Sequence, residues 1–131
     1  MKLRYFSIEE AEALIPTLTS ILQAAQETKS MIEKKVEQWR KSHKKMSIVD
    51  ETVVRGQVDF LASQLETQLG EIAELGATPK DLDLGLVDFP ARIDGHEAYL
   101  CWKMGEEKIK HWHGLTEGYA KRKSIKKRKN G

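Results

Sequence analysis

The chain has 131 residues, which is enough for one compact domain with or without a tail and too few for a large multi-domain enzyme. Hydrophobic residues make up 40% of it and charged residues 32%, a balance typical of globular proteins that excludes disorder throughout. The net charge of +2 is unevenly spread, because residues 121–129 hold seven basic groups and residues 1–120 hold 15 basic against 20 acidic groups.

A long helix is predicted over residues 8–41. Ser7 and Glu10 have the spacing of a capping box, in which each side chain accepts a hydrogen bond from a free backbone N–H at the helix start. Apolar residues then recur at alternating spacings of four and three residues over four heptads, a pattern typical of a helix that packs on another helix. Pro16 lies inside this segment and is expected to bend it, because proline removes one backbone hydrogen bond.

A second helix is predicted over residues 50–75, with Asp50 as its N-cap and Gly76 after its last turn. Residues 41–47 have no periodic apolar pattern and form the predicted connection, so the two helices make an antiparallel hairpin. Such a hairpin alone buries too little apolar surface to be stable. Because two copies of the hairpin would complete a four-helix bundle, we predict a homodimer through the long helices.

A two-stranded β-hairpin is predicted over residues 84–103. Its tip is the Asp-Gly pair at 94–95, which favours a two-residue type I′ turn. Counting back from this tip pairs Asp88 with Cys101 and places both on one face together with Tyr99. The opposite face then carries only apolar side chains, which are expected to cover the helices: Val87, Phe89, Ala91, Ile93, Ala98, Leu100 and Trp102.

A short helix is predicted over residues 106–113, because two acidic residues lie where the positive end of a helix dipole would be. Residues 121–131 are expected to be a flexible basic tail, since they offer little apolar surface to bury. The predicted fold is therefore a single α+β, mainly α domain over residues 1–120, built from the long helical hairpin, the C-terminal β-hairpin and the short helix.

The string GLVDFP at residues 85–90 and the residues that follow it form an unusual pattern. The pattern continues with Leu100-Cys101-Trp102, Gly105-Glu106, Ile109, Trp112-His113, Gly118 and Arg122. In this pattern, and in Phe6, Glu10-Ala11 and Ile15-Pro16 near its start, the chain resembles the bacterial family called domain of unknown function 2203. The resemblance implies a family without an assigned activity, so it indicates a domain and supplies no mechanism.

The candidate functional site is the polar face of the β-hairpin and the residues expected beside it: Asp88, Tyr99, Cys101, Glu106 and His113. Four of these, Asp88, Cys101, Glu106 and His113, can bind a metal, and their mixed donors would suit zinc or a related transition metal. No pair among them has the spacing of a known zinc motif. Each residue alone also has an ordinary structural role, such as a small buried thiol or a histidine that pairs with a carboxylate.

An enzyme that uses Cys101 as nucleophile, His113 as base and Asp88 as orienting group is a weaker hypothesis, because nothing in the sequence indicates an activated thiol. The sequence contains no glycine-rich phosphate loop and no dinucleotide-binding fingerprint. We therefore assign no catalytic residue, lean against an enzyme, and expect no cofactor unless a metal such as zinc binds.

The basic tail suggests a nucleic-acid accessory protein as another alternative, because clustered positive charge attracts phosphate regardless of base sequence. Its residues are Lys121, Arg122, Lys123, Lys126, Lys127, Arg128 and Lys129. The lone Cys101 and the lack of a long apolar run favour a cytoplasmic protein with no membrane contact. The preferred interpretation is a small self-associating module that binds a protein partner or small ligand at the candidate site, and a metal-binding protein or metal-dependent enzyme is the first alternative.

Overall fold

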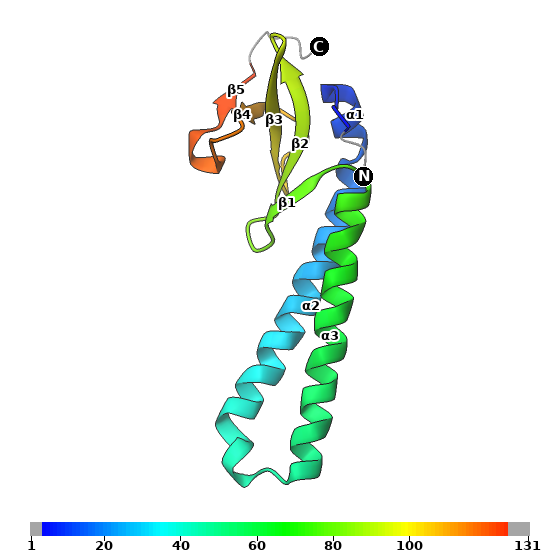
Figure 1. The fold of residues 1–131 in the computed structure, drawn as a ribbon, viewed down its shortest axis with the longest axis vertical. Coiled ribbons are helices and arrows are strands. Elements are labelled where there is room, and N and C mark those ends of the chain that lie inside the picture. Colours follow the sequence, from blue (N-terminus) through cyan, green and yellow to red (C-terminus); the bar gives the residue numbers. More distant parts are fainter. Residues whose placement is uncertain (1–3, 126–131) are drawn as a thin grey trace.

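A long helical hairpin carries a small antiparallel sheet at one end (Figure 1). The computed structural model describes residues 4–125 and has the predicted α+β, mainly helical fold. Its helices are α1 (Ile8–Ala13), α2 (Ile15–Ser42) and α3 (Ile48–Glu74), with 3-10 helices η1 (His43–Lys45) and η2 (Tyr119–Lys121). Its strands are β1 (Thr78–Asp81), β2 (Leu86–Ile93), β3 (His96–Lys103), β4 (His111–His113) and β5 (Lys123–Ser124).

The first predicted helix begins as expected but is divided in two. The Ser7 hydroxyl accepts a hydrogen bond from the Glu10 N–H at 3.1 Å, and the Glu10 carboxylate accepts one from the Ser7 N–H at 2.9 Å, which confirms the capping box. The bend expected at Pro16 is a break at Leu14, between α1 and α2. Pro16 therefore lies in the first turn of α2, where its missing N–H has no helical partner to lose.

The second helix confirms the antiparallel hairpin but starts two residues earlier than predicted. Its N-cap is Ser47, whose hydroxyl accepts a hydrogen bond from the Asp50 N–H at 3.0 Å. The prediction of Asp50 as the N-cap was wrong. Asp50 instead lies in the first turn, where its negative charge interacts favourably with the positive end of the helix dipole.

The predicted β-hairpin is confirmed residue by residue. Strands β2 and β3 pair antiparallel in the expected register, including Asp88 opposite Cys101 and Ile93 opposite His96. At the tip, Asp94 and Gly95 both have positive φ, 54° and 81°, as a type I′ turn requires. The hairpin is the centre of a five-stranded antiparallel sheet in the order β1-β2-β3-β4-β5, so it has a neighbouring strand on each side.

The helix predicted over residues 106–113 is not helical. Residues 106–110 are irregular, and the segment ends in β4, which pairs with β3. Tertiary contacts outweigh the local helix signal, because the Ile109 N–H donates to Glu12 of α1 at 2.9 Å and the Trp102 indole donates to the Glu106 carbonyl at 2.8 Å. The short helical element of this region is η2, which lies later in the chain.

The segment expected to be a basic tail begins inside the sheet. Strand β5 pairs with β4, and the Ile125 side chain after it is buried in the core. The expectation that residues 121–125 would not be buried was therefore wrong for Ile125 and for Arg122, whose side chain is 17% exposed. Residues 126–131, which include Lys126, Lys127, Arg128 and Lys129, lie outside the described residues.

The core lies between the apolar face of the sheet and the sheet-proximal ends of the helices. It joins the seven predicted inward-facing residues of β2 and β3 to Phe6, Ala11, Leu18, Leu22 and Ile72. Beyond these residues the hairpin continues away from the sheet, as Figure 1 shows, and there α2 packs along α3. No helix within residues 4–125 is long and apolar enough to cross a membrane.

Candidate metal centre

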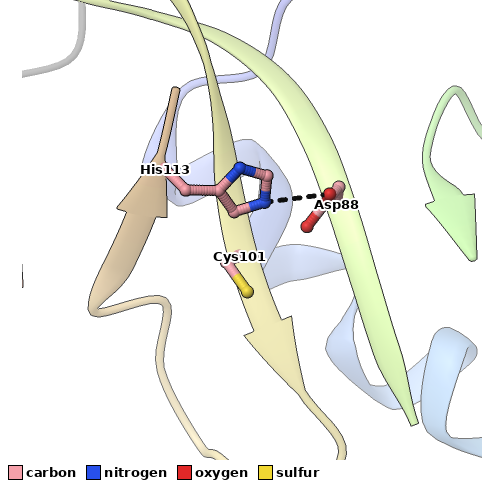
Figure 2. Close-up of side chains that lie close together, drawn as sticks. All are labelled: Asp88, Cys101 and His113. Atoms are coloured by element: carbon pink, nitrogen blue, oxygen red, sulfur yellow. Dashed lines mark hydrogen bonds and ion pairs between the residues drawn. The ribbon is translucent and has the colours of Figure 1, made fainter. Parts of the chain in front are cut away.

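Three neighbouring strands bring Asp88, Cys101 and His113 together on the face of the sheet that points away from the helices. Asp88 on β2 lies directly opposite Cys101 on β3, while His113 on β4 is paired with Tyr99, two residues from Cys101. Figure 2 shows the three side chains pointing toward one another across the strands. One carboxylate oxygen, the Cys101 Sγ and one imidazole nitrogen all lie within 4.8 Å of one another.

The imidazole of His113 is fixed at both nitrogens. Its Nδ1 lies 2.9 Å from the Gly114 carbonyl oxygen, and its Nε2 lies 3.0 Å from the Asp88 Oδ2 (Figure 2). A carbonyl oxygen can only accept a hydrogen bond, so Nδ1 is the donor in that contact. Nε2 therefore faces the carboxylate and the thiol, which is the orientation of a metal-binding histidine held by its backbone contact.

The cluster is closed off from solvent. Asp88 is 2% exposed, Cys101 1% and His113 3%. Burial, and after it the negative charge of Asp88, raise the pKa of the Cys101 thiol to about 11, while a hydrogen bond from Arg122 acts in the opposite direction. The thiol is therefore protonated at neutral pH, so the sequence-based hypothesis of a Cys101 nucleophile has no support in this environment.

Arg122 and Glu106 lie against the cluster on the side of Cys101. The guanidinium donates to both carboxylate oxygens of Glu106, at 3.3 and 3.1 Å, and it lies close enough to the Cys101 thiol to lower the pKa of that thiol. The Glu106 Oε1 further accepts the Lys103 N–H at 2.7 Å. The Arg122 guanidinium also stacks 4.6 Å from the centre of the Tyr119 ring. Arg122, which was expected to belong to a flexible tail, thus lies beside the site and is held there by Glu106.

The structure gathers three of the four predicted metal-capable residues into one cluster. Glu106 is not in the group of converging ligand atoms, since its carboxylate is bonded by Arg122 and a backbone N–H. Tyr99 lies beside the cluster, with its ring centre 5.5 Å from that of His113. Sequence reasoning brought Asp88 and Cys101 together through the hairpin register, but it had placed His113 on a helix.

Sequence reasoning left His111 out of the site, because a helix was predicted there, and it missed the structural role of Arg122. On β4, His111 is paired with Cys101 and lies on the same face as His113. Its Nδ1 is buried without a hydrogen-bond partner among the described residues and lies 3.7 Å from the Glu106 Oε2. The spacing of two between the histidines was the available signal, because it aligns side chains only in a strand.

The cluster offers one oxygen, one sulfur and one nitrogen donor in a water-poor environment. A carboxylate, a thiolate and an imidazole are the three side-chain types that bind zinc in proteins, and a mixed set of them suits transition metals better than magnesium or calcium. The structure thus contains a buried group that could hold a metal ion.

Searches of curated proteins and of solved structures gave no match. A family model does match, over residues 4–125, which is nearly the whole chain and includes every residue of the cluster. The family is described as "Uncharacterized conserved protein (DUF2203)". The resemblance noted in the strings at residues 85–90 and 100–113 is thereby confirmed, and the chain belongs to the DUF2203 family.

Proposed function

We propose that the protein binds one transition-metal ion, preferably Zn²⁺, through a carboxylate oxygen of Asp88, the Sγ of Cys101 and the Nε2 of His113. The observation that supports this is the convergence of three different buried ligand atoms within 4.8 Å of one another. Around a tetrahedral zinc ion, such atoms are separated by about 3.3–3.7 Å. The 3.0 Å between the His113 Nε2 and the Asp88 Oδ2 is close to this range, so small side-chain shifts would complete the site.

The charges of the site also suit a divalent cation. An ionised Asp88 and a thiolate at Cys101 supply two negative charges, while His113 binds metal as the neutral imidazole. The neighbouring Glu106 and Arg122 form an ion pair and neutralise each other. A bound divalent ion would therefore leave this buried region without net charge, which is the least costly state for groups removed from water.

Arg122 and Glu106 are proposed as positioning residues for this site. Metal binding requires the Cys101 proton to leave, and its raised pKa makes that step unfavourable without the ion. The positively charged guanidinium beside Cys101 would stabilise the thiolate, and Glu106 holds the guanidinium in place. Glu106 is thus proposed to support a ligand and not to be one.

Burial favours an ion over a larger occupant. The broader expectation was a protein partner or small ligand bound at Asp88, Tyr99, Cys101, Glu106 and His113. Three of these five are at most 3% exposed, so a molecule larger than an ion would reach them only if the covering segment moved. We retain that hypothesis for the rim, where Tyr99 and Glu106 are half-buried. No reaction is proposed for the site.

The test is metal binding by the full chain. Equilibrium dialysis against Zn²⁺, followed by elemental analysis, is expected to give one ion per chain. Replacement by Co²⁺ is expected to give an absorption band of a thiolate bonded to cobalt. Asp88→Asn, Cys101→Ser and His113→Gln should each weaken binding by about tenfold or more. Asp83→Asn and His96→Gln, both at exposed positions, are the matched controls and should bind as the parent does.

Two results would overturn the proposal. One is a parent protein that binds no more zinc than the Asp88→Asn/Cys101→Ser/His113→Gln triple variant. The other is a parent–cobalt complex without a thiolate band, which would mean that Cys101 is not a ligand. Circular dichroism of each variant separates a lost ligand from a lost fold.

The nucleic-acid hypothesis and the cytoplasmic location stay predictions. Of the seven basic residues on which that hypothesis depends, Arg122 bonds Glu106 and Lys123 forms an ion pair with Glu117 at 2.7 Å. Nucleic-acid binding would therefore depend mainly on the basic residues at 126–129, which lie outside the described part of the chain. Deleting residues 126–131 should abolish binding to single-stranded RNA, and undiminished binding would move the interface to the folded body.

A further inference from the structure

The half of the helical hairpin far from the sheet exposes apolar side chains that nothing in the described chain covers. Among residues 4–125, six of the nine exposed large hydrophobic residues lie there: Met31, Val36, Ile48, Val49, Val53 and Phe60. Phe60 is 69% exposed and Val53 53%. None of these six side chains belongs to the core that the sheet forms with the near ends of α2 and α3, so the fold of one chain leaves them exposed.

Part of this surface is a groove that runs between the two helices, which we call the distal groove. It is lined by Met31 and Lys35 of α2 and by Val53, Gly56, Gln57, Phe60 and Leu61 of α3. A Cβ added at Gly56 would meet nothing within 4 Å in the chain, so there is room for another backbone to approach. Glycine inside a helix is also less stable than alanine, and intramolecular packing does not explain its presence here.

The two helices that border the distal groove carry opposite charge. Residues 29–42 of α2 contain five basic and two acidic residues, whereas residues 48–60 of α3 contain three acidic residues and one basic residue. A two-fold axis that places α2 of one copy beside α3 of another therefore brings unlike charges together twice. The alternative, α2 beside α2, brings like charges together.

We infer that the distal groove binds a second copy of this chain, so that two hairpins form a four-helix bundle with each α2 beside the partner's α3. The groove is bordered by two helices, so a helical partner can pack its apolar side chains into it. The chain supplies such a partner with the matching apolar stripe and the complementary charges. This assembly is separate from the metal centre, which lies on the sheet at the other end of the molecule.

The test is the mass in solution of the full chain, measured by sedimentation velocity over a concentration series. The parent is expected to be a dimer. Phe60→Glu should raise the dimer dissociation constant by about thirtyfold or more, the effect of losing a central apolar contact. The matched control is Ala62→Glu, which adds the same charge at an exposed position of the same helix outside the groove, and it should change the constant by less than about threefold.

A second pair of measurements tests the orientation. Lys34→Glu/Lys41→Glu should weaken the dimer if α2 lies beside the partner's α3, and it should strengthen the dimer if α2 lies beside α2. A parent that stays monomeric over the series overturns the inference, as does a Phe60→Glu dimer of unchanged strength. Met31→Glu serves as the alternative groove variant if Phe60→Glu fails to fold, since Met31 is also exposed in a single chain.

Discussion

The stability of this fold is expected to depend on one buried pair of side chains, Asp88 and His113. Both side chains are 3% exposed and their polar atoms are 3.0 Å apart, so neither has water as an alternative partner. The backbone carbonyl of Gly114 fixes the other imidazole nitrogen. Removing one member of a buried pair therefore leaves the other without a partner in a region that solvent does not reach.

Asp88→Ala is expected to lower the free energy of unfolding of the metal-free protein by about 3 kcal/mol, because His113 is left buried without its partner. Urea denaturation followed by circular dichroism measures this change. Asp88→Ala/His113→Leu should lose less than the sum of the two single substitutions, since the second change removes the orphaned group. Additive losses would show that the two side chains do not interact.

The site was only partly predictable at the scale of residues. The register of one hairpin was enough to place Asp88 opposite Cys101, because the Asp-Gly tip fixes every later pair. Arg122 was not predictable, since its contact with Glu106 joins residues 16 positions apart through an irregular segment. No local pattern encodes such a contact.

At the scale of elements, the tip of the β-hairpin sets the register on which the proposed metal site depends. Gly95 has a φ of 81°, a conformation that side chains with a Cβ rarely adopt, and a Cβ there would meet nothing within 4 Å. The change in stability caused by a substitution at this position therefore reports the cost of the backbone conformation alone, because no packing clash contributes.

Gly95→Ala should lower the free energy of unfolding by about 1–2 kcal/mol. Gly95→Asn is the matched control and should lose less, because asparagine tolerates positive φ better than alanine does. Thermal unfolding of the three proteins in one buffer measures the difference. Equal losses in both variants would mean that the turn conformation is not the source of the effect.

The capping box of α1 makes the stability of the fold depend on pH in the acidic range. The backbone hydrogen bond from Ser7, and with it the Ser7 hydroxyl contact and the charge of Arg4, hold the pKa of Glu10 below its usual value of 4.5. A group whose pKa is lower in the folded state stabilises the fold above that usual value, and the contribution is lost as the pH falls through the folded pKa.

Glu10→Gln should therefore reduce stability near neutral pH and make no difference in strong acid. The measurement is the free energy of unfolding of parent and variant from neutral pH down to below 4.5. Glu9→Gln, in the same first turn and outside the capping box, is the control. A difference between parent and Glu10→Gln that persists unchanged into strong acid would contradict the assignment.

The elements themselves were predictable where a local signal is strong. Ser7, Glu10 and the long apolar stripe specified a helix, and alternating apolar residues specified β2 and β3. Strand β4 has only three residues and was taken for part of a helix, because its identity comes from pairing with β3 and not from its own composition. The same holds for β5, which was assigned to a tail.

At the scale of the whole molecule, the chain has two ends with different properties. The sheet end has the hydrophobic core and the buried polar cluster, whereas the distal half of the hairpin is two helices with exposed apolar side chains. Segments with few buried apolar contacts open more readily than a core does. Stability is therefore expected to be uneven along the molecule unless a second copy covers the distal groove.

Hydrogen exchange should detect this difference. Amides of residues 31–60 are expected to exchange faster than those of β2 and β3 in dilute protein, and to slow as the protein concentration rises and dimers form. Exchange in β2 and β3 should not depend on concentration, which provides an internal control. Slow exchange along the distal hairpin at every dilution would show that a single chain stabilises it.

Native mass spectrometry of the full chain, purified without added metal and then given Zn²⁺, tests the proposed metal site most directly. We predict one zinc ion for each copy of the chain, and a lower zinc occupancy in the Cys101→Ser variant at the same zinc concentration while the protein remains folded. A parent spectrum without zinc, or a Cys101→Ser variant with the same zinc occupancy as the parent, would contradict the proposed site.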